Sequence, residues 1–232
     1  MPRLAIRRIG AELLDDPSAV PWEVEASLHN IARANRWFGG LAALRYGLAR
    51  VLRGVPPGST VTLLDLGTGL GDGPRAAVAW GARHRIRIVP LGLERNRVAA
   101  RLASGRGIPV VLGCAGQPPI AERSVDLVLV SQVAHHFEPE SVVELFRTCT
   151  RLARMGVVVA DLRRARLGAV AFRVGARLLR FDPHTRADGV TSIQRGYTAR
   201  ELARLLERAG VRGHVARRPG YRLVATWEPA PA

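Results

Sequence analysis

Two groups of polar residues in the chain could do chemistry. The first is Asp65, followed by a turn that contains Gly67, Gly69 and Gly71, and the second is the adjacent pair His135 and His136. Glycine lets a ligand come close to the backbone, and a neighbouring carboxylate favours a ligand that carries positive charge. A histidine held by a carboxylate can take a proton from a hydroxyl group near neutral pH. The sequence therefore predicts a ligand site and a proton-transfer site.

The glycine turn is predicted to join a buried strand to a helix. A second apolar strand ends in Glu94, about 20 residues past the turn, where nucleoside-binding sheets hold a ribose diol. No Gly-Lys-Ser/Thr sequence follows the turn, which excludes a P-loop. The Asp65 carboxylate disfavours a pyrophosphate and favours a ligand with an amino group. A purely structural turn between strand and helix is the alternative.

Strand and helix patterns alternate along the chain. We predict strands at 60–65, 86–93, 109–113, 125–131, 156–161, 211–217 and 221–227. Helices are predicted at 22–37, 41–52, 72–83, 95–104 and 139–153, and a capping box at Thr198 and Glu201 opens a helix that ends near Ala209. This alternation predicts an α/β protein with a parallel, doubly wound sheet.

Residues 63–73 resemble motif I of the class I S-adenosylmethionine-dependent methyltransferases. The resemblance continues through 91–94, 111–115 and 124–131, and covers roughly residues 55–165. It implies a Rossmann-like, seven-stranded sheet whose last strand is antiparallel. It also implies an N-terminal helical lid at 1–54 and a cofactor-binding methyltransferase domain at 55–232, with a helical cap inserted at 163–197 after the fifth strand.

The resemblance implies S-adenosylmethionine as cofactor and S-adenosylhomocysteine as product. Glu94 would accept hydrogen bonds from the ribose diol, and Asp65 with the turn backbone would hold the amino-acid end. Cys114 stands where the family usually has an aspartate near the adenine, which leaves that contact to backbone groups. The full expected set is Asp65, Gly67, Thr68, Gly69, Gly71, Glu94, Arg95, Cys114, Ala115, Ser131 and Gln132. No metal site is expected.

The candidate catalytic residues are His136, His135 and Asp161. The histidines follow the fourth strand and Asp161 ends the fifth, so all three should lie at one crevice of the sheet. We expect one histidine to be a general base that Asp161 orients, and favour His136. The segment resembles His-His sequences of natural-product O-methyltransferases. The alternative is that one histidine caps a helix and the other packs, as we expect for His29.

Composition points to an anionic surface near the protein. The formal net charge is +16, and all 35 basic residues are arginine. Nucleic acid or an anionic membrane would match this charge. The absence of lysine excludes Schiff-base chemistry. Cys114 and Cys149 have no metal-ligand spacing and read as reduced thiols of a cytoplasmic protein. No apolar run is long enough to span a bilayer.

The expected cap contains a basic amphipathic helix. One arc of it holds Leu167, Val170, Ala171, Val174, Leu178 and Phe181, and another holds Arg166, Arg173, Arg177 and Arg180. It reads as a helix packed over the active site with a solvated arginine face, or as a helix that rests on anionic lipid. Residues 163–197 resemble bacterial methyltransferases associated with type III polyketide synthases, which implies O-methylation of a phenolic, lipid-tailed product.

Three alternatives stay open at this point. C-methylation of a quinone-type lipid needs the same base and a similar substrate. Nucleic-acid methylation is disfavoured, because Ser131-Gln-Val-Ala replaces the usual Asn/Asp-Pro-Pro-Tyr/Phe and stacking aromatics are few. A methyltransferase-like subunit without activity is disfavoured by the glycines, Glu94 and the histidine pair. The sequence does not decide the oligomeric state.

Overall fold

A computed structural model describes Arg7, residues 12–16 and residues 18–230. Within them lies a seven-stranded sheet in the order β3-β2-β1-β4-β5-β7-β6. Its strands are β1 (Thr60–Leu66), β2 (Arg87–Glu94), β3 (Val110–Leu112), β4 (Val125–Ser131), β5 (Ala153–Leu162), β6 (His214–Arg218) and β7 (Arg222–Trp227). Strands β1 to β5 are parallel, and β7 is antiparallel to both of its neighbours. The expected Rossmann-like sheet is confirmed.

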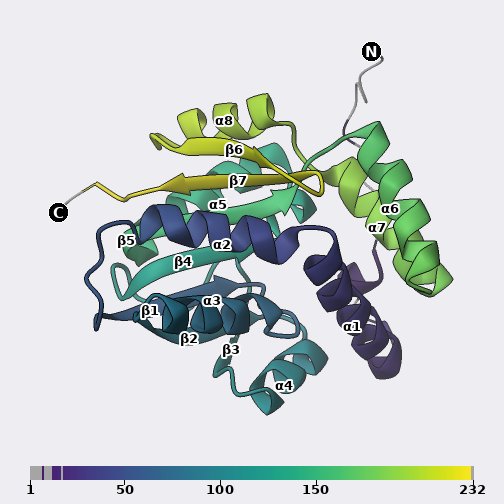
Figure 1. Cartoon of the computed structure of the whole chain (residues 1–232), viewed down its shortest axis with the longest axis horizontal. Coiled ribbons are helices and arrows are strands. Elements are labelled where there is room, and N and C mark those ends of the chain that lie inside the picture. Colours follow the sequence, from purple (N-terminus) through teal and green to yellow (C-terminus); the bar gives the residue numbers. More distant parts are fainter. Residues whose placement is uncertain (1–6, 8–11, 17, 231–232) are drawn as a thin grey trace.

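Helices cover both faces of this sheet (Figure 1). They are α1 (Pro21–Trp37), α2 (Gly40–Val51), α3 (Asp72–Arg83), α4 (Arg97–Gly105), α5 (Pro139–Leu152), α6 (Arg166–Leu178), α7 (Pro183–Arg195) and α8 (Ala199–Arg208), with short 3-10 turns η1 (Leu13–Asp15) and η2 (Ala134–His136). Figure 1 shows α2 and α3 in front of the sheet and α5 behind it.

Alternate residues of each central strand enter different cores, as the two-residue period of a strand requires. On β4, Val128 and Val130 pack on the side of α5 and α8, whereas Leu127 and Leu129 pack on the side of α2 and α3. Strands covered on both faces read as continuous apolar runs, which is why the sequence located them well.

The segment expected as an N-terminal lid divides into two parts. Leu44 and Leu48 of α2 are fully buried in the core that includes Val158 and Val224 of the sheet. Helix α2 is therefore a layer of the domain. Among the described residues of this segment, η1 and α1 are left to cover the ends of the strands, together with α6 and α7 from later in the chain.

The insertion after β5 contains one helix that the sequence did not predict. A second helix, α7, follows α6; Asp182 caps it by accepting from the backbone N–H of Thr185. The sequence did not predict it, because Gly189 interrupts its middle; a side chain there would collide with the ring of Phe172 on α6. Strand β6 also begins at His214, three residues later than predicted.

Helix α6 of the insertion packs through an unexpected side. Its buried residues are Gly168, Phe172 and Ala176, and of the predicted apolar arc only Phe181, which lies just beyond the helix, is buried. The predicted apolar arc therefore faces outward, and the packed side of the helix is a third arc that the sequence did not identify. Small residues let the opposite arc sit close to α7. No helix in the described part of the chain has the length and apolarity needed to cross a membrane.

Candidate active site

A cavity of about 280 Å³ opens at the carboxyl ends of β1, β2 and β4. Ten of the eleven residues expected to bind the cofactor line it: Asp65, Gly67, Thr68, Gly69, Glu94, Arg95, Cys114, Ala115, Ser131 and Gln132. His135 and His136 line it as well. Asp161 does not line the cavity but is bonded to the His135 ring that does. The sheet thus brings the two predicted sites to one space.

The turn after β1 depends on glycine for its shape. Gly67, Gly69 and Gly71 all have positive φ angles, which disfavour other residues. A side chain on Gly67 would also collide with Val133. Gly71 is the exception among the expected cofactor residues: it does not line the cavity, and its missing side chain makes room for Ile108. Its part in the site is to shape the start of α3.

Asp65 is buried at the wall of this cavity with one oxygen unused. Its Oδ2 accepts from the hydroxyl of Thr68 at 2.8 Å, whereas its Oδ1 has no hydrogen-bond partner among the described residues. Burial raises the pKa of Asp65 to about 7 against the effect of that hydrogen bond. An unpartnered buried carboxylate oxygen is costly, and a ligand ammonium group would satisfy it. The residue fits the amino-acid end of S-adenosylmethionine.

Glu94, at the end of β2, is bonded to the backbone of the glycine turn. Its Oε2 accepts from the backbone N–H of Gly69 at 2.8 Å, and its Oε1 from that of Asn96 at 3.0 Å. Asn96 in turn caps α4 with its own side chain. These bonds fix the Glu94 carboxylate at the cavity wall, and each oxygen keeps a second lone pair for a ligand hydroxyl.

Gln132 joins the cofactor wall to α1 and β7. Its φ angle of 57° lies in the left-handed region, which is unfavourable for a residue with a side chain. Its amide donates to Asn35 Oδ1 and accepts from Arg222 at 2.8 Å. Asn35 also donates to Asp72 at 2.9 Å, and burial raises the pKa of Asp72. Two distant parts of the chain, α1 and β7, therefore hold the strained residue that follows β4.

His135 and Asp161 form a buried pair. The ring Nδ1 of His135 lies 2.6 Å from Asp161 Oδ1, and its backbone N–H donates to Oδ2 at 3.1 Å. Leu162 N–H also donates to Oδ1. Burial alone would raise the pKa of Asp161, but the charge of His135 and these bonds hold it below its ordinary value. The ring Nδ1 therefore faces an ionised carboxylate and carries a proton, so in the neutral form of the ring it is Nε2 that has the lone pair.

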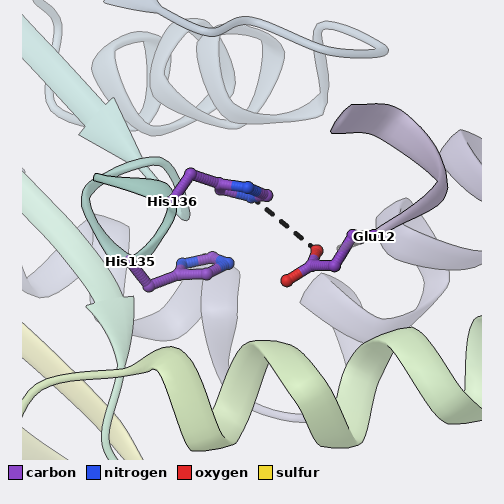
Figure 2. A group of neighbouring side chains, drawn as sticks. All are labelled: Glu12, His135 and His136. Carbon is purple, nitrogen blue, oxygen red and sulfur yellow. Dashed lines mark ion pairs between the residues drawn. The ribbon is translucent and has the colours of Figure 1, made fainter. Parts of the chain in front are cut away.

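His136 and Glu12 complete the cluster from the other side (Figure 2). Both imidazole rings point toward the Glu12 carboxylate, whose Oε2 lies 3.8 Å from Nε2 of His136. The other oxygen of Glu12 pairs with Arg195 at 3.1 Å. Donor atoms of Glu12, His135 and His136 lie within 4.8 Å of one another, which suits a metal ion as well as a proton relay. Arg195 already supplies Glu12 with a cationic partner.

The acceptor side of the site is built from segments far apart in the sequence. Arg7 donates to the backbone oxygens of His135 and Phe137 and, through Nε, to that of Arg195 at 2.6 Å. A smaller cavity of about 60 Å³ continues from the main one and is lined by Phe172, Ser192 and Ile193. The site therefore has a cofactor wall from β1 to β4 and an acceptor wall from η1, α1, α6 and α7.

Sequence reasoning missed Glu12, Asn35 and Ser192. Glu12 precedes the first periodic helix, so no pattern marked it. Asn35 could have been found from the sequence, because it is an uncharged polar residue at a buried position of α1. The remaining histidines lie elsewhere: His29 is exposed and contacts Arg106, so the expectation that it packs is wrong.

Comparison with known proteins distinguishes the cofactor wall from the acceptor wall. A family described as "Methyltransferase domain" matches residues 64–160, which span β1 through most of β5. The match excludes the acceptor wall. A search of curated proteins found no match.

Solved structures show the fold over more of the chain. A SAM-dependent methyltransferase from Aquifex aeolicus has a TM-score of 0.59 and 16% identity, and the alignment covers 91% of this chain and 99% of that one. Human N-acetylserotonin methyltransferase, solved in complex with SAM, has a TM-score of 0.62 and 14% identity, with 91% of this chain and 57% of that one covered.

The pyocyanin biosynthetic protein PhzM has a TM-score of 0.55 and 17% identity, with 82% and 55% covered. The chain thus spans little more than half the length of PhzM and of the human enzyme. Fold, matched domain and cofactor wall agree, and the chain carries a class I S-adenosylmethionine-dependent methyltransferase domain.

Proposed function

We propose that the protein transfers a methyl group from S-adenosylmethionine to the hydroxyl oxygen of a small hydrophobic phenol, as a step of secondary metabolism. The observation that carries this proposal is the His135–Asp161 pair, whose histidine lines the main cavity together with the cofactor wall. Bound S-adenosylmethionine supplies an electrophilic methyl group with a neutral thioether as leaving group.

The cofactor wall binds and orients. Asp65 Oδ1 would accept from the ammonium group of S-adenosylmethionine, and Glu94 would accept from its ribose diol. Gln132 and the turn at Gly67 and Gly69 shape the wall between them. Most of the rate enhancement comes from holding the acceptor oxygen in line with the methyl group.

The proton of the acceptor hydroxyl passes to Nε2 of His135. Asp161 holds the ring in the required tautomer and stabilises the imidazolium that forms. The sequence favoured His136 as the base, whereas the contact with Asp161 supports His135. We assign His136 and Glu12 to the acceptor side, where His136 positions the hydroxyl and Arg195 fixes Glu12.

A matched pair of histidine variants tests this assignment. We expect His135→Ala to lower kcat on a phenolic acceptor by about 10² to 10⁴ fold, because a general base contributes that much. His136→Ala should mainly raise KM. S-adenosylmethionine binding, measured by calorimetry, should be unchanged in both.

The product separates the reaction classes. Mass spectrometry and NMR of the product should show a methyl ether. A methyl group on ring carbon would assign the enzyme to the quinone-type reaction. Full turnover by His135→Ala would refute the base assignment but leave the cofactor site intact.

A further inference from the structure

The outer surface of α6 is apolar and open to solvent. Four side chains along it have more than half of their surface exposed: Leu167 (68%), Val170 (53%), Val174 (52%) and Leu178 (79%). Their spacing of three or four residues places them on one side of the helix. Scattered apolar residues are common on surfaces, but a continuous row over the length of a helix indicates a binding surface.

A row of arginines borders this apolar row. Arg173, Arg177 and Arg180 are exposed, and no hydrogen bond or ion pair joins their guanidinium groups to another described residue. Helix α6 itself contains no acidic residue. Beside α6, Asp182 accepts from Thr185, and Asp188 accepts from the backbone N–H of Leu13. The charges of Arg173, Arg177 and Arg180 are therefore not paired within the part of the chain that the structure describes.

The inner surface of α6 belongs to the acceptor wall. Phe172 lines the smaller cavity with Ile193 of α7. Gly175 packs against the ring of Phe38, which follows α1. In Figure 1, α6 forms the right-hand edge of the molecule, outside α7. One helix thus separates the acceptor cavity from an apolar, basic surface.

We propose that this surface of α6 docks on an anionic lipid bilayer, with the apolar row among the acyl chains and the arginines at the headgroups. A helix with these two arcs lies in the plane of a membrane interface. Charge complementarity favours lipid over a second copy of the chain, because each copy carries a net charge of +16 and the copies repel. The docked enzyme would take its hydrophobic acceptor from the membrane.

Sedimentation with vesicles tests the proposal independently of activity. The wild type should sediment with vesicles of phosphatidylglycerol and phosphatidylcholine in equal parts, and not with phosphatidylcholine alone. Each arginine near an anionic surface contributes about fivefold to binding, so Arg173→Glu with Arg177→Glu should weaken binding by at least about 25-fold. Arg200→Glu with Arg204→Glu, an exposed pair of equal spacing on α8, is the charge-matched control and should bind almost as the wild type does.

The apolar row has its own matched pair. Val174→Asp should abolish vesicle binding, whereas Val78→Asp, at an exposed valine of α3, should not. Equal losses of vesicle binding in the two arginine double variants would show that binding depends on net charge alone. That result would overturn the proposal that α6 is the docking surface. So would the absence of wild-type binding. A dimer that Val174→Asp dissociates in analytical ultracentrifugation would make a second copy the occupant and also overturn the proposal.

Discussion

Two buried aspartates lie near the carboxyl ends of β1 and β5, which β4 separates in the sheet, and their surroundings shift their pKa values in opposite directions. Asp65, in β1, has one oxygen without a partner and a pKa raised to about 7 by burial. Asp161, in β5, has both oxygens bonded and a pKa held low by His135. In the proposed function, the free oxygen of Asp65 would accept from a ligand cation, whereas both oxygens of Asp161 are bonded within the protein. The difference separates a binding carboxylate from an orienting one.

Replacing each aspartate by asparagine tests this comparison, and the change at Asp161 should have the largest effect on activity. Asp161→Asn keeps the shape but presents an amide that cannot hold His135 in the required tautomer, so kcat should fall by about 10² to 10⁴ fold. Binding of S-adenosylmethionine, measured by calorimetry, should be unchanged. The variant should also be less stable at neutral pH, since a carboxylate with a lowered pKa stabilises the fold above its unfolded pKa. Wild-type turnover would contradict the role of the pair.

Asp65→Asn should show the reverse pattern. Affinity for S-adenosylmethionine should fall by about 10- to 100-fold, the value of a hydrogen bond to a charged group. Stability should rise above pH 7, because the folded protein binds the Asp65 proton more tightly than the unfolded chain. Each pKa unit corresponds to about 1.4 kcal/mol, so the rise from 3.8 to about 7 weakens folding by about 4 kcal/mol at high pH.

Thermal unfolding at two pH values checks the stability prediction. Wild-type stability should fall between about pH 4 and pH 7 from this group and stay low above it, while Asp65→Asn escapes that loss. A variant that loses both affinity and stability would show that Asp65 is structural.

A smaller effect concerns the pH dependence of cofactor binding. Below pH 7 the proton on Asp65 competes with the ligand ammonium group, so wild-type affinity should fall by up to about tenfold per pH unit. Asp65→Asn should bind weakly but with a flat profile. Calorimetry between about pH 5 and pH 8, a range that includes the titration of Asp65, measures the affinity of the wild type and of the variant. A flat wild-type profile would place the ammonium group elsewhere.

The smallest effect is expected from chelation. Arg195 pairs with Glu12, and His135 is held by Asp161, so the cluster in Figure 2 is satisfied without a metal ion. Turnover should therefore survive EDTA within the error of the assay. A loss of activity that Zn²⁺ or Mg²⁺ restores would change the cluster from a proton relay to a metal site.

The cofactor wall was readable from sequence because its chemistry is local. A carboxylate, three glycines and a second carboxylate follow one another at fixed spacing, and the buried strands between them are continuous apolar runs. Even there, the role of Gly71 as a packing residue required the position of Ile108.

The acceptor wall was not readable in the same way. Glu12 meets His136 only through the fold, and the choice between His135 and His136 depends on where Asp161 lies. The packed side of α6 was also not identified from sequence, because the larger apolar arc is the exposed one and small residues at Gly168 and Ala176 form the packed arc.

The bonds of Arg7 have a consequence for the order of assembly. Its contact with Arg195 closes a loop of 188 residues, and its contact with His135 spans 128. Contacts of such separation form late and slow folding, since the chain between them must first be ordered. During synthesis the strands of the cofactor wall emerge before α7, whereas the acceptor wall must wait for it. The strands that carry Asp65 and Glu94 are therefore synthesised well before the helix that closes the opposite side of the cavity.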